Sequence, residues 1–184
     1  MKRSVIALAS LALAACSGGG TVVSYTSYDN YGVSHFVYAA AERDLEVRVR
    51  GNPFAASGDA AFADAVVAAM QGANSGPRTH FVGGPTASTR DNFHVALVFN
   101  PSAATTADAA CAGQATALGA GGEPIRILAA FCNRGRPLSF LESKASAASA
   151  ADPGFRALIR QSTYQLFPIS DPFVNRGECQ GIDC

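Results

Sequence analysis

One segment of the chain, 43–50, alternates strictly between apolar and charged residues. Leu45, Val47 and Val49 point to one side, and the charged side chains between them point to the other. This pattern is typical of a strand with one wet face, so it favours an antiparallel or mixed sheet that is covered on one side only. The preceding stretch, 33–41, is expected to begin this strand or to pair beside it.

Four more strands are expected further along the chain. They are 79–82, 92–99, 124–132 and 138–144. The second of these alternates between an apolar face and a face that carries His94, Ala96 and Val98. The last two form a hairpin around residues 133–136, where Asn and Gly supply the backbone freedom that a tight reversal needs.

Apolar residues at helical spacing predict two helices, 59–71 and a closing helix that begins at Asp152 and ends before Pro168. Asp152 is a capping acid, and the proline after it suits the first helical position. Between the strands, 105–118 is expected to be helical or irregular. This order favours an α+β fold, a two-layer sandwich with a mostly antiparallel sheet and two helices packed on one face, formed by residues 33–170.

The first residues match a leader that the cell removes. Two cations precede an uncharged apolar run too short to span a bilayer, which describes a signal peptide over residues 1–15. The sequence Leu13-Ala14-Ala15-Cys16 resembles the bacterial lipobox, which implies cleavage before Cys16 and lipidation of its thiol. Residues 16–32 are then expected to be a flexible tether, because three glycines follow Ser17. An ordinary secretory cleavage site, with Cys16 as a free thiol, is the alternative.

The lipid on Cys16 decides the expected location. Three acyl chains would hold the protein on a membrane permanently for practical purposes. In bacterial sorting, aspartate after the lipidated cysteine retains a lipoprotein in the inner membrane, and Ser17 stands there instead. We therefore expect an outer-membrane protein that faces the periplasm, with the membrane as a partner through the lipid anchor.

The charge balance excludes some partners. The whole chain has 14 basic and 14 acidic side chains, and two of the cations lie in the leader. A mature chain is thus close to neutral, without the basic excess that holds nucleic acid and without a charge run that would bind lipid head groups. No nucleic-acid partner is expected.

Four cysteines remain after the lipid attachment site, an even number in a compartment where disulfides persist. We favour one bridge between Cys111 and Cys132 and another between Cys179 and Cys184, which would close a small loop in the tail, 171–184. A zinc site is the alternative, but these cysteines lack the close pairs and histidines that such sites usually combine. No metal or other cofactor is expected.

Several segments occur in a suggestive order: the lipobox, a strand ending in GNPF, a helix with FADAVVAAM, a strand FHVALVF and a closing helix that runs into QLFP. Together they resemble small bacterial periplasmic lipoproteins of unknown function, over about 33–168. Those proteins are in turn similar in build to auxiliary lipoproteins of envelope transport and lipopolysaccharide assembly. The resemblance implies an accessory role in the cell envelope.

Three histidines, His35, His80 and His94, are the candidates for proton transfer near neutral pH. His80 and His94 are expected on neighbouring strands, where they could meet and, with Asp91, bind a metal. A structural or solvent-facing histidine is the commoner outcome. The G-x-S-x-G turn of many serine hydrolases is missing, which lowers the odds of such a hydrolase without excluding it.

Arginine and tyrosine side chains supply the candidates for binding. Arg134 and Arg136, at the hairpin tip, could present two guanidinium groups to a phosphate or carboxylate. Solvation of an exposed turn is the alternative. Tyr25 and Tyr28, with Tyr31 behind them, would either dock a partner or cover the edge of the sheet.

The leading hypothesis is a non-catalytic, membrane-anchored lipoprotein whose domain binds another envelope component, because an anchor signature occurs without a catalytic motif. Its ligand-binding candidates are Arg134, Arg136 and His94. A small envelope hydrolase that uses His94 or His80 is the second hypothesis. A purely structural role in the envelope is the third.

Overall fold

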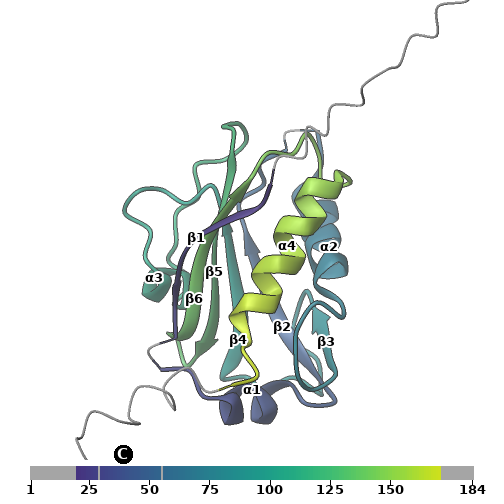
Figure 1. Cartoon of the computed structure of the whole chain (residues 1–184), viewed down its shortest axis with the longest axis vertical. Helices are drawn as coiled ribbons and strands as arrows, with labels where there is room; N and C mark the ends of the chain where they lie inside the picture. Colours follow the sequence, from purple (N-terminus) through teal and green to yellow (C-terminus); the bar gives the residue numbers. More distant parts are fainter. Residues whose placement is uncertain (1–19, 29, 55, 171–184) are drawn as a thin grey trace, which may run out of the picture.

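The alternating segment becomes β2, one strand of a six-stranded sheet (Figure 1). The structure, a computed structural model, describes residues 20–28, 30–54 and 56–170. The strands lie in the order β1-β6-β5-β4-β2-β3 across the sheet. Their bounds are β1 (Val22–Ser27), β2 (Arg43–Arg50), β3 (Thr79–Val82), β4 (Phe93–Phe99), β5 (Ile125–Asn133) and β6 (Arg136–Ala145).

The sheet is mixed. β2 lies between β3 and β4 and runs parallel to both. The pairs β4–β5, β5–β6 and β6–β1 are antiparallel. The parallel neighbours β2 and β3 are joined through a helix, because a short hairpin cannot connect parallel strands. The antiparallel pairs are therefore in the majority, as the sequence pattern predicted.

Four helices accompany the sheet: α1 (Val33–Ala40), α2 (Asp59–Met70), α3 (Ala107–Cys111) and α4 (Pro153–Leu166). Figure 1 shows α2 and α4 side by side over one face of the sheet, and these two helices also contact each other. The start of α4 is as predicted, because the Asp152 carboxylate accepts a hydrogen bond of 2.7 Å from the backbone N–H of Gly154. The α+β class, with a helical layer on a sheet, is confirmed.

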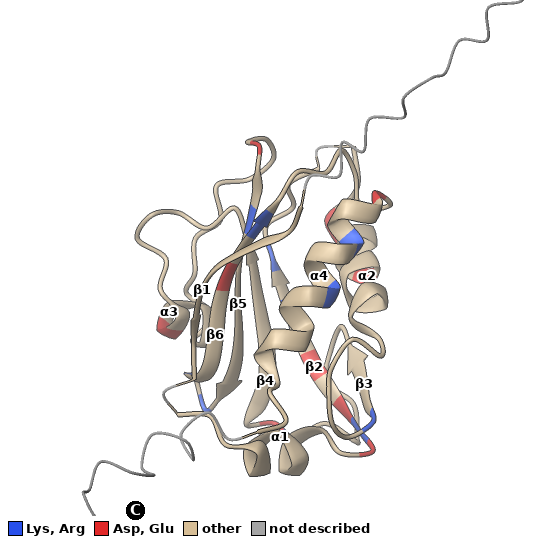
Figure 2. Ribbon diagram, viewed as in Figure 1, with Lys and Arg blue, Asp and Glu red and all other residues tan. Residues whose placement is uncertain are grey.

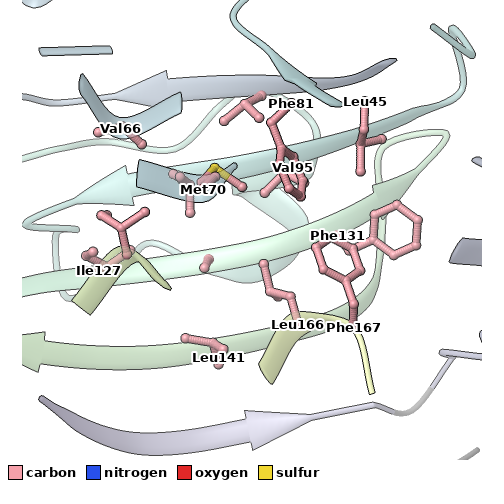
Figure 3. Packing of buried hydrophobic residues seen from close by; sticks show 14 of the residues in the cluster. Leu45, Val66, Met70, Phe81, Val95, Ile127, Phe131, Leu141, Leu166 and Phe167 are labelled. Carbon is pink, nitrogen blue, oxygen red and sulfur yellow. The ribbon is translucent and has the colours of Figure 1, made fainter. Parts of the chain in front are cut away.

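The main hydrophobic core lies between this helical layer and the sheet (Figure 3). Five strands contribute buried side chains to it, among them Leu45, Phe81, Val95, Ile127 and Leu141. Aromatic rings fill much of the space between the layers. Phe36 stacks on Phe167 with ring centroids 4.1 Å apart, and Phe62 meets Phe99 edge-on at 4.7 Å.

Residues 33–41, which were expected to extend the sheet, instead form α1. Phe36, Ala39 and Ala40 are buried, and their spacing puts them on one side of a helix. The valines and aromatic residues of this stretch favour a strand, but packing of Phe36 against Phe131 and Phe167 decides the outcome. The sequence-based prediction was wrong here.

The folded part of the chain begins before residue 33. β1 lies within the segment 16–32, which was expected to be a tether, and it pairs with β6 from Val22 opposite Lys144 to Ser27 opposite Phe140. Tyr31 is also buried in the core. The predicted boundary at residue 33 is therefore too late, because the preceding residues supply an edge strand.

The opposite face of the central strands is covered as well. Residues 100–118, here called the cover segment, include α3 and lie against β4 and β5. A disulfide between Cys111 and Cys132 joins the cover segment to β5 and confirms that predicted bridge. The expectation of a sheet covered on one side only was thus wrong for β4 and β5. On β2 the side chains of Glu46 and Arg48 remain on a wet face, where they form a salt bridge of 2.8 Å.

Candidate functional site: the open edge of the sheet

The two edges of the sheet differ in how their backbone groups are bonded. At the β3 edge, the side-chain amide of Gln71 donates a hydrogen bond of 2.7 Å to the carbonyl of Phe81. The same amide accepts one of 3.2 Å from the Phe81 N–H. Gln71 therefore occupies the position that another strand would take. An edge blocked in this way does not invite a further strand.

Among the residues that the structure describes, no side chain caps the β1 edge in this way. In the part of the chain that the structure describes, the Val22–Thr26 backbone pairs with β6 alone, and the register shifts by one residue between Val23 and Tyr25. Val22 and Tyr25 are about half exposed, at 48% and 54%. An edge strand with free backbone groups and exposed apolar side chains is a template for pairing with another chain.

The three tyrosines near the start of the domain have different roles. Tyr28 donates a hydrogen bond of 2.7 Å to the Gln165 carbonyl, and Tyr31 donates one of 3.0 Å to the Pro168 carbonyl. These two residues fasten the first part of the chain to the end of α4, and burial raises the pKa of Tyr28. Tyr25 instead lies on the outer face of the sheet with its ring 5.6 Å from that of Phe140. The tyrosines were expected either to dock a partner or to cover the edge of the sheet. Among the three, Tyr25 alone is placed where it could contact a partner.

Phe140 belongs to this surface, and the sequence analysis missed it. Its neighbours on the same face of β6 are Glu142 and Lys144, so an aromatic residue interrupts a polar stripe. That interruption is a signal that the sequence contained. Phe140 is half-buried, because it packs against the apolar cluster under the cover segment, and its ring lies 5.6 Å from that of Tyr25. Tyr25, which is exposed, and Phe140, which is half-buried, together form an aromatic pair beside the open edge.

His94, a predicted binding residue, is buried beneath the cover segment and is only 4% exposed. It pairs with Glu46 on β2 and with Cys132 on β5. Burial is the main reason why the pKa of His94 is lowered, and the Arg48 guanidinium lowers it further. Glu46 and a backbone hydrogen bond with Cys111 act in the opposite direction. His94 is therefore buried out of contact with solvent, where its charged form is disfavoured and where it cannot meet a substrate.

His80 does not meet His94, because β2 lies between their strands. Its Nδ1 atom lies 2.9 Å from a carboxylate oxygen of Asp44, whose other oxygen accepts a hydrogen bond of 2.6 Å from Thr86. These hydrogen bonds, that of Thr86 first, lower the pKa of Asp44. His80 and Asp44 line a shallow depression of about 200 Å³. The pair has the geometry of an orienting acid and a base, and no hydrogen bond joins His80 to a hydroxyl among the described residues.

The two hairpin arginines do not converge. Arg134 takes a left-handed turn conformation, with φ of 50°, and its N–H bonds to the carbonyl of Asn92. Arg136 lines a cavity of about 190 Å³ together with Asp108 and Asn30, and Arg134 is not among the residues lining it. The buried His94 is separate from both. The three binding candidates Arg134, Arg136 and His94 therefore do not gather at one site.

Other predicted sites fall outside the described residues. These are the lipid attachment site Cys16 and the bridge between Cys179 and Cys184. In the described part of the chain, no three His, Cys, Asp or Glu side chains gather as a metal site would require, so His80, His94 and Asp91 do not form one. The helices of that part are also too short or too polar to cross a membrane.

No protein-family model, curated protein or solved structure matches this chain. Its function is therefore inferred from the chemistry of the chain itself. Within the described residues, the open β1 edge with its aromatic pair is the surface best suited to another protein. Gln71 makes the contrast clear, because it closes the other edge.

Proposed function

We propose that this protein is a lipid-anchored component of the bacterial outer membrane, facing the periplasm, that binds another envelope protein without catalysing a reaction. The proposal places the partner at the β1 edge. One observation carries it: among the described residues no side chain caps the edge strand β1, which lies beside the exposed ring of Tyr25, whereas Gln71 caps the β3 edge.

The position of β1 in the chain supports a partner at the membrane. Six residues lead from Cys16, the proposed lipidation site, to Val22 at the start of β1. A chain of that length reaches at most about 20 Å. The open edge is then held close to the lipid surface. A partner at this edge would itself be an envelope protein with an extended segment near the membrane.

Strand addition gives the proposed complex its chemistry. An extended partner segment would take up the free backbone N–H and C=O groups of Val22–Thr26, which supply affinity with little dependence on sequence. Specificity would come from side chains that alternate along the added strand. An apolar or aromatic side chain on its outer face would meet Tyr25 and Phe140.

Recovery of a partner from detergent-solubilised envelope tests this proposal. The full-length lipidated protein should retain a specific envelope protein, and Tyr25→Lys should abolish the retention, because a charge on an edge strand opposes strand addition. Tyr164→Lys is the matched control, since Tyr164 is equally exposed, at 60%, but lies on α4. Failure to recover a specific partner, or equal recovery by Tyr25→Lys, would overturn the proposal.

The His80–Asp44 pair supports a second candidate, a small envelope hydrolase. The His80 ring is exposed, and the Asp44 carboxylate orients its Nδ1 atom. The Nε2 atom of His80 is therefore left for proton transfer. Burial of His94 argues against a similar role for that residue. Turnover of ester, peptide or glycan substrates that disappears in His80→Ala, and persists in His35→Ala, would favour this candidate over a binding function.

A further inference from the structure

A polar cavity opens where the cover segment meets the outer face of β1, β5 and β6. Its volume is about 210 Å³, which is larger than a single water requires. The side chains that line it and carry the argument are Ser24, Ser102, Thr105, Arg126, Glu142 and Lys144. None of these residues belongs to the aromatic pair or to the histidine sites. The cavity is therefore a separate site.

Two cations face this cavity from adjacent strands. Arg126 on β5 and Lys144 on β6 are direct partners in the antiparallel ladder. Figure 2 shows the blue segments side by side near one end of these strands. Such partners have Cβ atoms about 5 Å apart, and like charges placed directly opposite each other destabilise a sheet. The sequence has no run of cations here, so only the pairing of the strands creates this concentration of positive charge.

The Arg126 side chain is held in place. One guanidinium nitrogen donates a hydrogen bond of 2.9 Å to the carbonyl of Pro101, in the cover segment. The backbone N–H of Arg126 also donates a hydrogen bond of 3.1 Å to the side-chain oxygen of Asn100. A guanidinium carries five N–H donors, so others remain for a ligand. Arg126 and Lys144 thus form a donor side of the cavity, which suits the oxygens of a phosphate.

The hydroxyl groups around the cavity act as acceptors. Thr105 donates its single proton to the Thr116 carbonyl, at 2.8 Å. In the hydrogen bond of 2.9 Å between Ser102 and Thr105, the donor must then be Ser102. Ser24 donates its proton to the backbone carbonyl of Glu142, at 3.2 Å. Both serine oxygens are left with lone pairs only, so they can receive a donor from a ligand but cannot give one.

A carboxylate completes the acceptor side. Glu142 lies two residues before Lys144 on the same face of β6, and Figure 2 shows a red segment on β6 beside the blue pair. It sits diagonally from Arg126, a separation of about 7–8 Å. No salt bridge within 4.0 Å is formed by Glu142 among the described residues. The cavity therefore combines two cations with a carboxylate and two hydroxyl oxygens among its lining groups.

We propose that this cavity binds a phosphate group that carries a neighbouring primary ammonium, the chemistry of phosphoethanolamine. The phosphate contacts Arg126 and Lys144, and the ammonium donates to Glu142 and the serine oxygens. A plain phosphate would meet Glu142 unfavourably, and a plain amine would meet the two cations unfavourably. A ligand that carries both charges can place its phosphate near the two cations and its ammonium near Glu142, so neither repulsion arises. The phosphate also offsets the repulsion between Arg126 and Lys144 across the two strands.

The ligand could be the head group of a membrane lipid or a soluble compound with the same chemistry. Lys144 is the ladder partner of Val22, so the cavity lies at the end of β1 where the chain enters the domain. If Cys16 is lipidated, this end is the one held near the membrane, which favours the lipid. The site itself depends on neither the anchor nor the partner proposed above.

Titration of the full-length protein in detergent tests the cavity. O-phosphoethanolamine should bind saturably and should shift the side-chain N–H resonance of Arg126, whereas glycerol phosphate and ethanolamine should bind about tenfold more weakly or worse. Lys144→Met should weaken binding about tenfold. Arg136→Met is the matched control, because it removes one cation from the same strand outside the cavity. It should leave binding unchanged.

Glu142 provides the sharper test of the acceptor side. Glu142→Gln should remove the preference for O-phosphoethanolamine over glycerol phosphate, whereas Asp64→Asn, on the exposed side of α2, should keep it. To decide whether the ligand is a lipid head group or a soluble compound, the protein is placed in nanodiscs of phosphatidylcholine with or without phosphatidylethanolamine. A shift of the Arg126 resonance with phosphatidylethanolamine supports the lipid, and a shift with the soluble compound alone supports a soluble ligand. Absence of any shift with both, or equal binding of all three soluble compounds, overturns the proposal.

Discussion

The disulfide between Cys111 and Cys132 should contribute about 3 kcal/mol to the free energy of unfolding. The two residues are 21 positions apart. Closing a loop of that length restricts the unfolded chain by an entropy worth about 3 kcal/mol at 25 °C. With a urea dependence of about 2 kcal/mol per molar, reduction of this bond should lower the urea midpoint by about 1.5 M.

Reduction should also expose His94. The ends of the cover segment have other bonds to hold them, since Leu118 bonds to Asn100, and Asn100 bonds to Arg126 on β5. Helix α3 has only five residues, too few for a stable isolated helix, and it depends on the disulfide and on small apolar contacts to remain over the sheet. When α3 moves away, water reaches His94. The pKa of His94 should then rise toward its ordinary value, because burial is the main cause of its lowering.

Urea unfolding and a proton titration of His94 by NMR would measure both effects. A background with Cys179→Ser and Cys184→Ser makes the Cys111–Cys132 bond the disulfide under test. In that background, reductant should lower the urea midpoint. When Cys111→Ala and Cys132→Ala are added to the same background, reductant should have no effect on the midpoint. A change smaller than about 1 kcal/mol on reduction, or a His94 pKa that stays low in the reduced protein, would refute the reasoning.

Three further outcomes are expected. Because the pKa of His94 is lowered on folding, the unfolded chain binds the proton more readily, so stability should fall as pH drops below about 6.5, and His94→Gln should flatten that dependence. Gln71→Ala should free the Phe81 backbone and cause concentration-dependent self-association in sedimentation velocity. Gly51→Ala should lower the free energy of unfolding by about 2 kcal/mol or more, because φ is +79° and the new Cβ would lie 2.7 Å from that of Ala117.

Each of these three predictions has a control variant or a result that would contradict it. Gly72→Ala carries the strain of a positive φ without a neighbour within 4 Å, so it should cost less than Gly51→Ala in the same denaturation assay. Equal costs would mean that contact with Ala117 is not the reason. For Gln71, a variant that stays monomeric at all concentrations would show that its amide is not needed to block the edge. For His94, an unchanged slope of stability against pH in His94→Gln would assign the slope to other groups.

Local patterns predicted most of the elements because their causes are local. Strand 43–50 is set by its own alternation, the closing helix by Asp152 and the proline after it, and the hairpin by its Asn and Gly. The bridge between Cys111 and Cys132 was also predictable, because few pairings were open. Elements of this kind carry in their own residues the signal that determines them.

The misses have causes that lie elsewhere in the chain. Helix α1 is rich in residues that favour strands, and packing against residues distant in the chain, such as Phe131 and Phe167, favours the helix instead. Strand order is likewise non-local, and the insertion of β2 between β3 and β4 is what separates His80 from His94. The cation pair of Arg126 and Lys144 could not be foreseen either, because it depends on the register of two strands.

The two proposed surfaces share the strands β1 and β6 but use different chemistry, so each can fail without the other. Tyr25 lies opposite Glu142, and its ring lies on the same face of the sheet as the cavity, beside Phe140. A charge at Tyr25 blocks strand addition through the edge, whereas loss of the Lys144 ammonium removes a contact within the face. Tyr25→Ser, which removes the ring without placing a charge opposite Glu142, should therefore keep O-phosphoethanolamine binding, and Lys144→Met should keep the protein partner. If either variant abolished both, one continuous surface that takes a single ligand would explain the data better than two.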